Sequence, residues 1–286
     1  MAPLRLDTVL KLNDGRTIPQ LGLGVYQSRG RACVAGCAEA LRLGYRHIDT
    51  AQLYANEAEV GQAVRDEAHA KRDEAHAKRD DVFVTTKIWD SNHGYDAALR
   101  SLDKSLAASG LAYFDLVLIH SPNPGAAKRL ETYRALVDAR KRGLTRSIGV
   151  SNYGPHHLAE LDTHFPHDPP AVNQIEASPF FQRADIVAAC RKRSIVVQAY
   201  SPLGKGAFTS LPALQRIADR HAKTPAHVLI RWSLQRGFVC LPKSSNADRI
   251  AANADVFSFE LSDADMAELD AMETGSGITW NPTLVE

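Results

Sequence analysis

Residues 114–151 read FDLVLIHSPNPGAAKRLETYRALVDARKRGLTRSIGVS and contain one complete strand–helix–strand unit. The run Phe114–His120 is almost continuously apolar, which is typical of a parallel strand buried on both faces. The amphipathic stretch Lys128–Arg142 has helical spacing and ends before Gly143, a residue type favoured just past the end of a helix. The apolar run Ser147–Ser151 then supplies the second strand.

The same alternation of apolar and amphipathic segments extends over most of the chain. Eight segments have the character of buried strands: Leu21–Tyr26, Arg46–Asp49, Val82–Lys87, Phe114–His120, Ser147–Ser151, Ala171–Glu176, Ile195–Tyr200 and Phe238–Pro242. Helical patterns lie between them, for example at Arg31–Leu43, Tyr95–Ser109, Lys128–Arg142, Ala184–Arg193 and Pro225–Gln235. Eight such units predict an α/β fold of the (β/α)8 type, the TIM barrel.

A doubly wound sheet is the alternative fold. It is disfavoured because Gly22 and Gly24 are not followed by the third glycine of a dinucleotide-binding turn. Ahead of the first unit, Asn13-Asp14-Gly15 is a turn sequence and predicts an N-terminal β-hairpin. The chain has 286 residues and is 44% hydrophobic, so we expect one large barrel domain over residues 1–286.

The charge and cysteine content limit the kinds of partner. Thirty-four Lys and Arg residues against 33 Asp and Glu give a net charge of +1. This balance disfavours nucleic acid and membrane surfaces as partners, and it is uninformative about oligomeric state. The N-terminus has no apolar signal segment, so we expect a cytoplasmic protein. The four cysteines form no C-x-x-C pair and are expected to be buried and reduced: Cys33, Cys37, Cys190 and Cys240.

One segment departs from the regular alternation. The heptad Asp66–Arg72, DEAHAKR, is repeated without change as Asp73–Arg79. Its only apolar residues are alanines, and Glu–Lys pairs recur four residues apart, as on a solvent-exposed helix. We therefore expect residues 66–79 to be an inserted spacer that extends the second helix.

Polar residues collect where the predicted strands end, which in a barrel is the end that carries the chemistry. They are Asp49, Lys87, His120, Ser151, Asn152, Gln174, Glu176, Tyr200, Ser201, Lys243 and Ser244. Each alone is weak evidence, because strand-end polar residues often cap helices or face solvent. Their occurrence after seven of the eight strands indicates an active site.

Three of these side chains, Asp49, Lys87 and His120, make chemical sense around one carbonyl group together with Tyr54, which lies five residues beyond Asp49. A hydride that reaches a carbonyl carbon leaves charge on oxygen, and Tyr54 is placed to supply the proton. The ammonium of Lys87 is expected to lower the pKa of this tyrosine, and Asp49 to keep the lysine charged. A neutral His120 imidazole is expected to donate a hydrogen bond that orients the carbonyl oxygen.

Seven motifs carry a resemblance to a known family: GYRHIDTAQLYANE, VFVTTKIW, FDLVLIHSP, RSIGVSNY, AVNQIE, QAYSPLGKG and LPKSSNADRIAANADVF. In this order, over nearly the whole chain, they resemble the aldo-keto reductase superfamily, closest to the branch of bacterial diketogluconate reductases and broad aldehyde reductases. The resemblance implies a catalytic tetrad of Asp49, Tyr54, Lys87 and His120 with the tyrosine as proton donor. It implies reduction of aldehyde or ketone carbonyls to alcohols.

The resemblance also implies NADPH as cofactor, bound without a dinucleotide fold. Ser151, Asn152 and Gln174 match the residues that bind the carboxamide, and Tyr200 matches the residue that stacks on the nicotinamide. The pyrophosphate positions are matched by Ser201, Leu203 and Lys205. The implied contacts to the 2′-phosphate are Lys243, Ser244 and Arg249, with Asn253 on the adenine.

Two departures from the family pattern concern the rims of the site. Ala252 stands where many relatives have Glu before the adenine contact, and Ser121 replaces a tryptophan after the fourth strand. Tyr26 and Trp89, with His120, are expected to line the substrate pocket, and Trp280 is an aromatic residue of the tail that either covers this pocket or packs in the core.

Two other functions stay open on the sequence alone. A metal-dependent barrel hydrolase would use His47, Asp49 and His120 as ligands. A non-catalytic NADPH-binding sensor of the same fold would keep the cofactor residues without turnover. The physiological substrate is not predicted, because the pocket loops that select it follow no general pattern.

Overall fold

The computed structural model describes residues 3–69 and 78–286. In this part of the chain eight parallel strands form the barrel: β3 (Leu23–Gly24), β4 (His47–Asp49), β5 (Phe83–Ile88), β6 (Phe114–Ile119), β7 (Thr145–Ser151), β8 (Val172–Glu176), β9 (Val196–Tyr200) and β10 (Val239–Leu241). Neighbours in sequence are neighbours in the sheet. Bridges from Leu21 to Cys240 and from Gly24 to Lys243 join its two edges. The predicted TIM barrel is confirmed.

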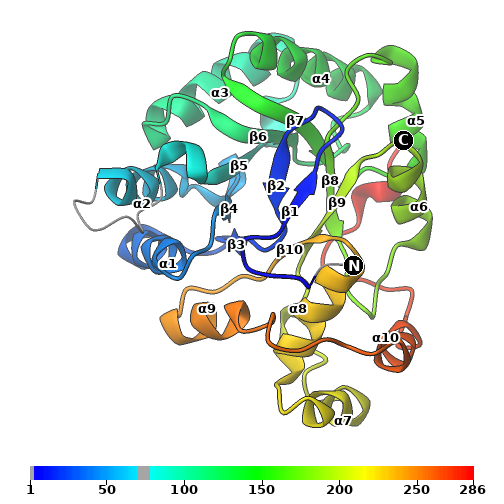
Figure 1. Ribbon diagram of the computed structural model, residues 1–286. Helices are drawn as coiled ribbons and strands as arrows, with labels where there is room; N and C mark the ends of the chain where they lie inside the picture. Colours follow the sequence, from blue (N-terminus) through cyan, green and yellow to red (C-terminus); the bar gives the residue numbers. More distant parts are fainter. Residues whose placement is uncertain (1–2, 70–77) are drawn as a thin grey trace.

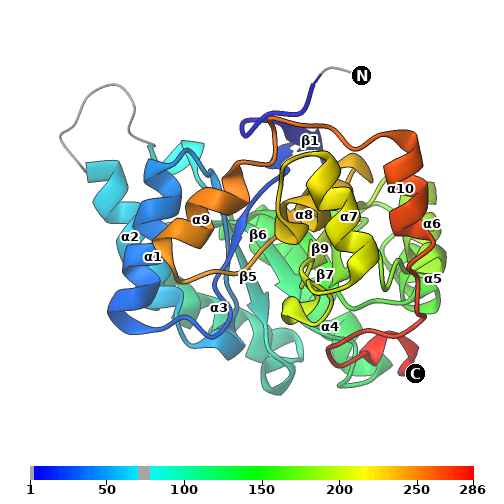
Figure 2. The same cartoon turned by 90° about the horizontal axis from the view of Figure 1, so that it is seen from below.

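Helices cover the outside of the barrel (Figures 1 and 2). They are α1 (Gly30–Arg42), α2 (Glu57–His69), α3 (Tyr95–Ser109), α4 (Ala126–Lys141), α5 (Pro155–His164), α6 (Ala184–Lys192), α7 (Pro212–Arg220), α8 (Pro225–Gln235), α9 (Ala247–Ala254) and α10 (Asp263–Asp270). Both ends of α3 and α8 agree with the prediction. Gly110, which directly follows α3, has a φ of 63°, a left-handed conformation that glycine adopts without strain.

The first barrel strand is much shorter than predicted. The sequence predicts Leu21–Tyr26, whereas β3 contains only Leu23 and Gly24. This strand closes the barrel, and single backbone hydrogen bonds, such as that from Gly22 to the carbonyl of Cys240, replace a continuous ladder there. Because the pairing at this closure is interrupted, β3 is only two residues long.

The predicted N-terminal β-hairpin is present, and it closes the amino-terminal end of the barrel. Its strands are β1 (Val9–Lys11) and β2 (Thr17–Pro19), which pair antiparallel. Leu12 and Ile18 are buried in an apolar cluster that includes Phe83 on β5 and residues of four further barrel strands. Figure 1 shows the hairpin lying across this end of the barrel. The barrel mouth that faces away from it is therefore the end available to a substrate.

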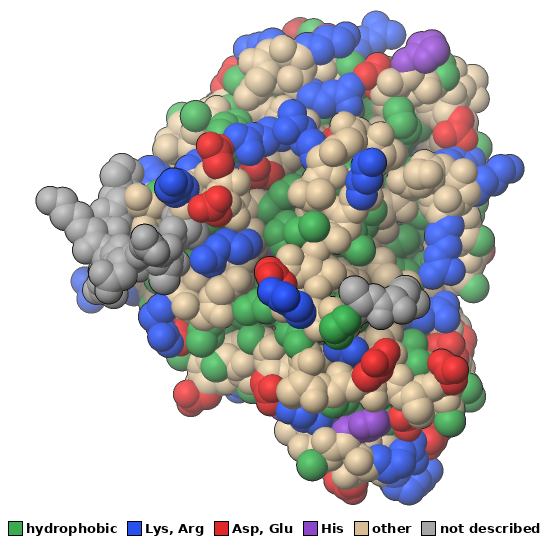
Figure 3. Space-filling view, viewed as in Figure 1, with side chains coloured by type: hydrophobic (Ala, Val, Ile, Leu, Met, Phe, Trp, Pro, Cys, Tyr) green, Lys and Arg blue, Asp and Glu red, His purple; other side chains and the backbone are tan. Residues whose placement is uncertain are grey.

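The prediction for the cysteines is confirmed. All four cysteines are buried and free of disulfide bonds. Basic and acidic side chains are interspersed over the face shown in Figure 3. Among the helices of the described ranges, none combines the length and the apolar character that a membrane crossing requires.

The tandem heptad lies mostly outside the described residues. Helix α2 is described as far as His69, and a 3₁₀ turn begins at Arg79. Arg79, the last residue of the repeat, forms an ion pair of 2.8 Å with Asp115 and lies 4.1 Å from the ring centre of Tyr113. Arg79 thus anchors the end of the repeat to the barrel. The role of residues 66–79 as a spacer stays a prediction.

Three buried histidines make the stability of the fold dependent on pH. Burial lowers the pKa of His47 from 6.5 to about 3, and lowers the pKa values of His93 and His157 to about 4. Between these values and pH 6.5 the unfolded chain binds more protons than the folded one, so acid favours unfolding. Each pKa unit corresponds to about 1.4 kcal/mol.

We therefore expect the contribution of these histidines to the free energy of unfolding to be fully retained above pH 6.5 and to fall as the pH drops from 6.5 to 4. Urea titrations at a series of pH values measure it. His93→Leu should flatten this dependence, since both ring nitrogens of His93 lack a hydrogen-bond partner among the described residues. The exposed His164 provides the control: His164→Gln should leave the slope unchanged. Equal slopes for all three proteins would contradict the assignment.

Candidate active site

The centre of the site is the fully buried ammonium group of Lys87, near the carboxyl end of β5. Its Nζ lies 2.5 Å from Oδ1 of Asp49, 2.9 Å from the carbonyl oxygen of Thr50 and 3.2 Å from the hydroxyl oxygen of Tyr54. Because an ammonium group has three hydrogens and no acceptor, these three bonds occupy it fully. The oxygen of Tyr54 therefore accepts from Lys87, and its own hydrogen is left to point elsewhere.

Local structure explains how Tyr54 reaches this position. The chain leaves β4 and turns at once into the 3₁₀ segment Gln52–Tyr54, in which the amide of Tyr54 donates to the carbonyl of Ala51 at 2.9 Å. Ala55 ends the turn in a left-handed conformation with a φ of 52°. The short turn returns the tyrosine over the end of its own strand and the neighbouring β5.

His120 follows β6 and completes the group of four. Its ring centre lies 5.8 Å from that of Tyr54 and 5.0 Å from that of Trp89. Burial, together with the charge of Lys87 and the proximity of His93, holds the pKa of His120 well below its usual value. The imidazole is therefore neutral at physiological pH, in agreement with the sequence-based expectation, and carries a single N–H donor.

The expected pKa shift of Tyr54 is wrong in direction. Burial of the phenol and the nearby carboxylate of Asp49 raise the pKa of Tyr54 well above its usual value. Sequence reasoning counted the ammonium of Lys87 alone, whereas Asp49 lies directly against that ammonium and offsets its charge. The consequence is a phenol that keeps its proton through the physiological pH range.

A chain of hydrogen bonds inside the barrel supports Asp49. The Nε2 group of Gln174 donates to Oδ2 of Asp49 and to Oε1 of Gln198, both at 2.7 Å. Gln198 in turn lies 3.3 Å from Nε2 of His47, which also contacts the hydroxyl of Thr85 at 3.1 Å. Each carboxylate oxygen of Asp49 thus has its own donor.

These hydrogen bonds around His47 and Asp49 argue against the alternative function of a metal-dependent hydrolase. The second nitrogen of His47, Nδ1, lies 3.3 Å from the carbonyl oxygen of Pro19, so both of its nitrogens already have protein partners. Asp49 is paired with a lysine rather than open to a cation. Within the described ranges, no group of three or more potential metal-binding side chains comes together.

Four residues expected to bind the cofactor lie next to His120 as one hydrogen-bonded group. Asn152 donates to the carbonyl of His120 at 3.0 Å and to the hydroxyl of Ser151 at 3.1 Å. The hydroxyl of Tyr200 donates to Oδ1 of Asn152 at 2.9 Å. Ser151 donates to the backbone carbonyl of Gln174 at 2.8 Å. The structure therefore brings the ends of β7, β8 and β9 together at one side of the group formed by Lys87, Asp49, Tyr54 and His120.

The loop after β9 contains the next three residues expected to contact the cofactor. Ser201 and Lys205 both have a φ of 50°, a left-handed conformation that is uncommon outside glycine. Lys205 is exposed, while Leu203 packs partly against the core. The loop thus presents an exposed cation while Leu203 anchors it to the barrel.

The remaining expected cofactor residues follow β10 and continue into α9. Lys243 and Arg249 are exposed, and Ser244 and Asn253 are buried. The side chain of Asn246 begins α9 by accepting a 2.9 Å hydrogen bond from the backbone amide of Arg249. In the described part of the chain neither cation forms an ion pair, so both are free to meet an anionic group.

Aromatic rings line the space above Tyr54 and His120. Tyr26 lies 5.0 Å from Tyr54, as expected for a pocket wall, and Trp89 lies 5.0 Å from His120. The tail residue Trp280 also reaches the site, 6.2 Å from Trp89 and 6.4 Å from His120. Tyr26 and Trp280 are 45% and 42% exposed, so their rings offer open apolar surface rather than core packing.

Sequence reasoning missed residues that hold the segments carrying Tyr26 and Trp89 in place. The side chain of Asn56 donates to the carbonyls of Val25 and Ser28 at 2.9 and 2.8 Å, which fixes the loop that carries Tyr26. Gln52 accepts a 2.9 Å hydrogen bond from the backbone amide of Trp89. Both residues stand within the GYRHIDTAQLYANE motif, but their partners are backbone groups of distant segments, which a single sequence does not reveal.

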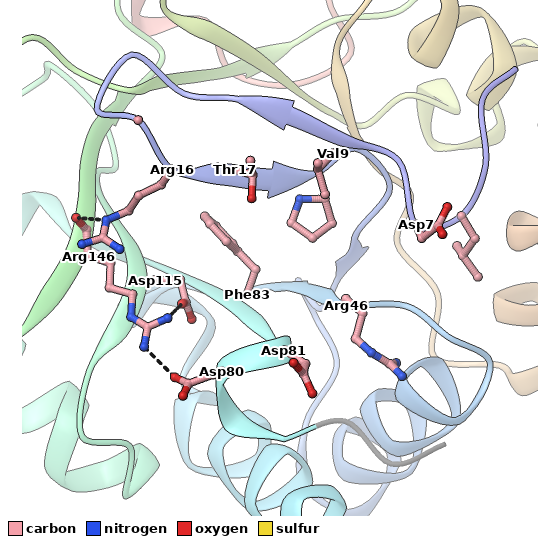
Figure 4. A pocket seen from close by; sticks show the side chains of 13 residues that line it. Asp7, Val9, Arg16, Thr17, Arg46, Asp80, Asp81, Phe83, Asp115 and Arg146 are labelled. Atoms are coloured by element: carbon pink, nitrogen blue, oxygen red, sulfur yellow. Dashed lines mark hydrogen bonds and ion pairs between the residues drawn. The ribbon is translucent and has the colours of Figure 1, made fainter. Parts of the chain in front are cut away.

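A cavity of about 680 Å³ lies at the other end of the barrel, beside the hairpin (Figure 4). Its wall carries several charged groups, of which Arg146 pairs with two: it lies 2.6 Å from Asp80 and 3.6 Å from Asp115. Thr17 and Phe83 complete the wall from the hairpin and the start of β5. The cavity is therefore separate from the Lys87 group.

Comparison with known proteins points to one family. A profile of the Aldo/keto reductase family matches residues 31–274. The chain is 44% identical over 275 residues to an aldo-keto reductase of Mycolicibacterium smegmatis, covering 96% of each protein. It is 38% identical over 283 residues to glyoxal reductase of Bacillus subtilis, covering 98% of each. A solved structure of Bombyx mori aldo-keto reductase in complex with NADP has a TM-score of 0.88 and 33% identity, with 96% of each chain covered. The chain belongs to the aldo/keto reductase family.

Proposed function

We propose that this protein uses NADPH to reduce the carbonyl group of small aldehydes or ketones, with Tyr54 as the proton donor. The observation that carries the proposal is the set of three hydrogen bonds donated by Lys87. Because one of them goes to the hydroxyl oxygen of Tyr54, the hydroxyl hydrogen of Tyr54 remains available for donation to a substrate. The names of two relatives support it, since one is a glyoxal reductase and another is solved with NADP. A cytoplasmic location stays a prediction.

The residues at the barrel mouth suit a nicotinamide cofactor. Both hydrogens of the Gln174 side-chain amide are donated to protein groups, whereas its Oε1 atom has no hydrogen-bond partner among the described residues. This oxygen and Oδ1 of Asn152 are the acceptors that a carboxamide N–H₂ group requires. We assign the carboxamide to Ser151, Asn152 and Gln174, and the nicotinamide ring to the face of Tyr200.

The rest of the cofactor is assigned along the loops that follow. The pyrophosphate is assigned to Ser201, Leu203 and Lys205, and the adenosine end to Lys243, Ser244, Arg249 and Asn253. Two exposed cations without an acidic partner in the described chain match the charge of a 2′-phosphate.

In the proposed reaction NADPH supplies the hydride, and the protein supplies the proton and the orientation. His120, neutral because of its lowered pKa, donates its N–H to the substrate oxygen and sets its position. Tyr54 then transfers its hydroxyl proton to that oxygen as negative charge develops on it. Lys87 stabilises the resulting phenolate at 3.2 Å, and Asp49 holds the lysine in place.

The direct test is turnover measured as loss of absorbance at the reduced-nicotinamide band. A panel of aldehydes, ketones and keto-sugars is supplied with NADPH, with and without a metal chelator. We expect turnover of at least small aldehydes such as glyoxal, unaffected by chelator. Binding of NADPH without turnover of any carbonyl compound would instead indicate a non-catalytic sensor. Loss of activity with chelator would favour the metal-dependent hydrolase.

Cofactor preference provides a separate prediction. A charge-assisted hydrogen bond contributes about 1.5–3 kcal/mol, and exposure reduces this contribution. We expect Arg249→Ala to raise the dissociation constant of NADPH by about tenfold or more and that of NADH by less than about twofold. Titration of tryptophan fluorescence measures both constants. Arg100→Ala, a change of an exposed arginine on α3, is the control. Equal weakening for both cofactors would show that Arg249 only supports its loop.

A further inference from the structure

Glu176, at the carboxyl end of β8, is a buried carboxylate whose hydrogen bonds come from the C-terminal tail. Its side chain accepts from the backbone amide of Ile278 at 2.7 Å and from the backbone amide of Thr279 at 3.1 Å. The hydroxyl of Thr279 donates a third hydrogen bond to it. Glu176 is 3% exposed and forms no ion pair within the described ranges. A buried negative charge of this kind depends on its donors, so it binds the tail strongly.

The tail is shaped to approach this carboxylate closely. A Cβ atom at Gly277 would lie 2.7 Å from Oε2 of Glu176 and 2.9 Å from the ring of Phe181, so any larger residue there would have to displace one of these side chains. Further along, the hydroxyl of Thr283 accepts a 2.6 Å hydrogen bond from Arg183. Figures 1 and 2 show the end of the chain beside α5 and α6. Contacts on both sides of residue 280 therefore hold the tail.

Trp280 follows directly after the residues that Glu176 holds. Its ring lies 6.2 Å from Trp89 and 6.4 Å from His120. The hydroxyl of Thr279 also lies 3.3 Å from that of Tyr200, the residue assigned to the nicotinamide. One carboxylate thus lies at the junction of the cofactor residues and the aromatic wall of the pocket.

We infer that Glu176 is a positioning residue: through Ile278 and Thr279 it fixes Trp280 as the third aromatic wall of the pocket, and so favours carbonyl substrates that carry a flat apolar group over very small ones. This inference rests on the proposed reductase function. Glu176 itself does not touch the substrate. Its effect is expected in KM for substrates large enough to reach Trp280, because the proton donor and its lysine are unchanged.

The test compares benzaldehyde, which carries an aromatic ring, with glyoxal, which is too small to fill the pocket. Thr279→Val keeps the shape of the side chain and removes the hydroxyl, whereas Thr279→Ser keeps the hydroxyl. We expect Thr279→Val and Glu176→Gln to raise KM for benzaldehyde about tenfold, the size of effect that loss of a charge-assisted hydrogen bond produces. Their kcat/KM for glyoxal should change less than about threefold, and Thr279→Ser should resemble the wild type. Trp280→Ala should raise KM for benzaldehyde at least as much as Thr279→Val.

Hydrogen exchange gives a second readout that does not depend on activity. The amides of Ile278 and Thr279 should exchange at least about tenfold faster in Glu176→Gln than in the wild type, while Ile119 in the barrel remains protected. Thr279→Val provides the same test if Glu176→Gln fails to fold. Unchanged exchange at both amides would show that Glu176 does not hold the tail and would overturn the inference.

The two proposals fail in distinguishable ways. If the wild type reduces neither aldehyde, the reductase function is wrong, and hydrogen exchange still decides whether Glu176 holds the tail. If the wild type reduces both, and Thr279→Val leaves the ratio of the two kcat/KM values unchanged, the reductase stands and the positioning role of Glu176 is overturned.

Discussion

Tyr54→Phe is expected to lower kcat/KM for an aldehyde by at least about 10²-fold, because the substitution removes the proposed acid. The hydroxyl acts when charge develops on the substrate oxygen, so the loss should appear in the chemical step. The dissociation constant of NADPH should change little. Lys87 keeps its bonds to Asp49 and to the carbonyl of Thr50, so the charged pair beneath the substrate remains in place.

Steady-state kinetics and fluorescence titration of the same preparation measure the two effects. Tyr95→Phe removes the hydroxyl of a tyrosine on α3 and is the matched control, expected to behave as the wild type. Retention of more than a tenth of the wild-type kcat/KM by Tyr54→Phe would remove Tyr54 from the role of proton donor.

Lys87→Met is expected to cost both activity and stability. The ammonium is fully buried against Asp49 at 2.5 Å, and removal of one partner of a buried pair typically costs about 3–5 kcal/mol. Burial already raises the pKa of Asp49, so without the lysine this carboxyl group should take up a proton at a higher pH. The phenolate of Tyr54 would lose its stabilising charge, and carbonyl reduction should fall at least about 10²-fold.

A double variant separates the two losses. Asp49→Asn together with Lys87→Met removes both charges and should regain part of the unfolding free energy, measured in urea, without regaining activity. If Lys87→Met were as stable as the wild type, or if the double variant recovered turnover, the buried pair would not have the role assigned to it.

The fold could be predicted well from the sequence because each unit repeats the same physical pattern. Segments such as Phe114–His120 are almost continuously apolar, and helices such as Tyr95–Ser109 end at a glycine that adopts a left-handed conformation. The first strand was overestimated, since its pairing depends on the closing edge of the barrel rather than on its own apolar residues. Residues 70–77 lie outside the described structure, so the spacer hypothesis stays a prediction.

The candidate site could be assembled from strand ends because a barrel brings these ends together. Asp49, Lys87 and His120 follow three consecutive strands, and the structure brings them together with Tyr54 within hydrogen-bond or ring contact. The direction of the Tyr54 pKa shift could not be predicted, because it depends on burial and on a 2.5 Å neighbour of Lys87. Glu176 was noted only as a strand-end residue, and its partners are tail amides about a hundred residues away.

The most direct test of the account is the fate of the hydrogen at C4 of the nicotinamide. NADPH carrying deuterium at both C4 positions is incubated with glyoxal and the purified protein in ordinary water, and the product is analysed by mass spectrometry. We predict one deuterium per molecule of product, bound to the former carbonyl carbon, and none in the product formed in the absence of protein. An alcohol product without deuterium, or consumption of NADPH without any reduced product, would contradict the proposed carbonyl reductase.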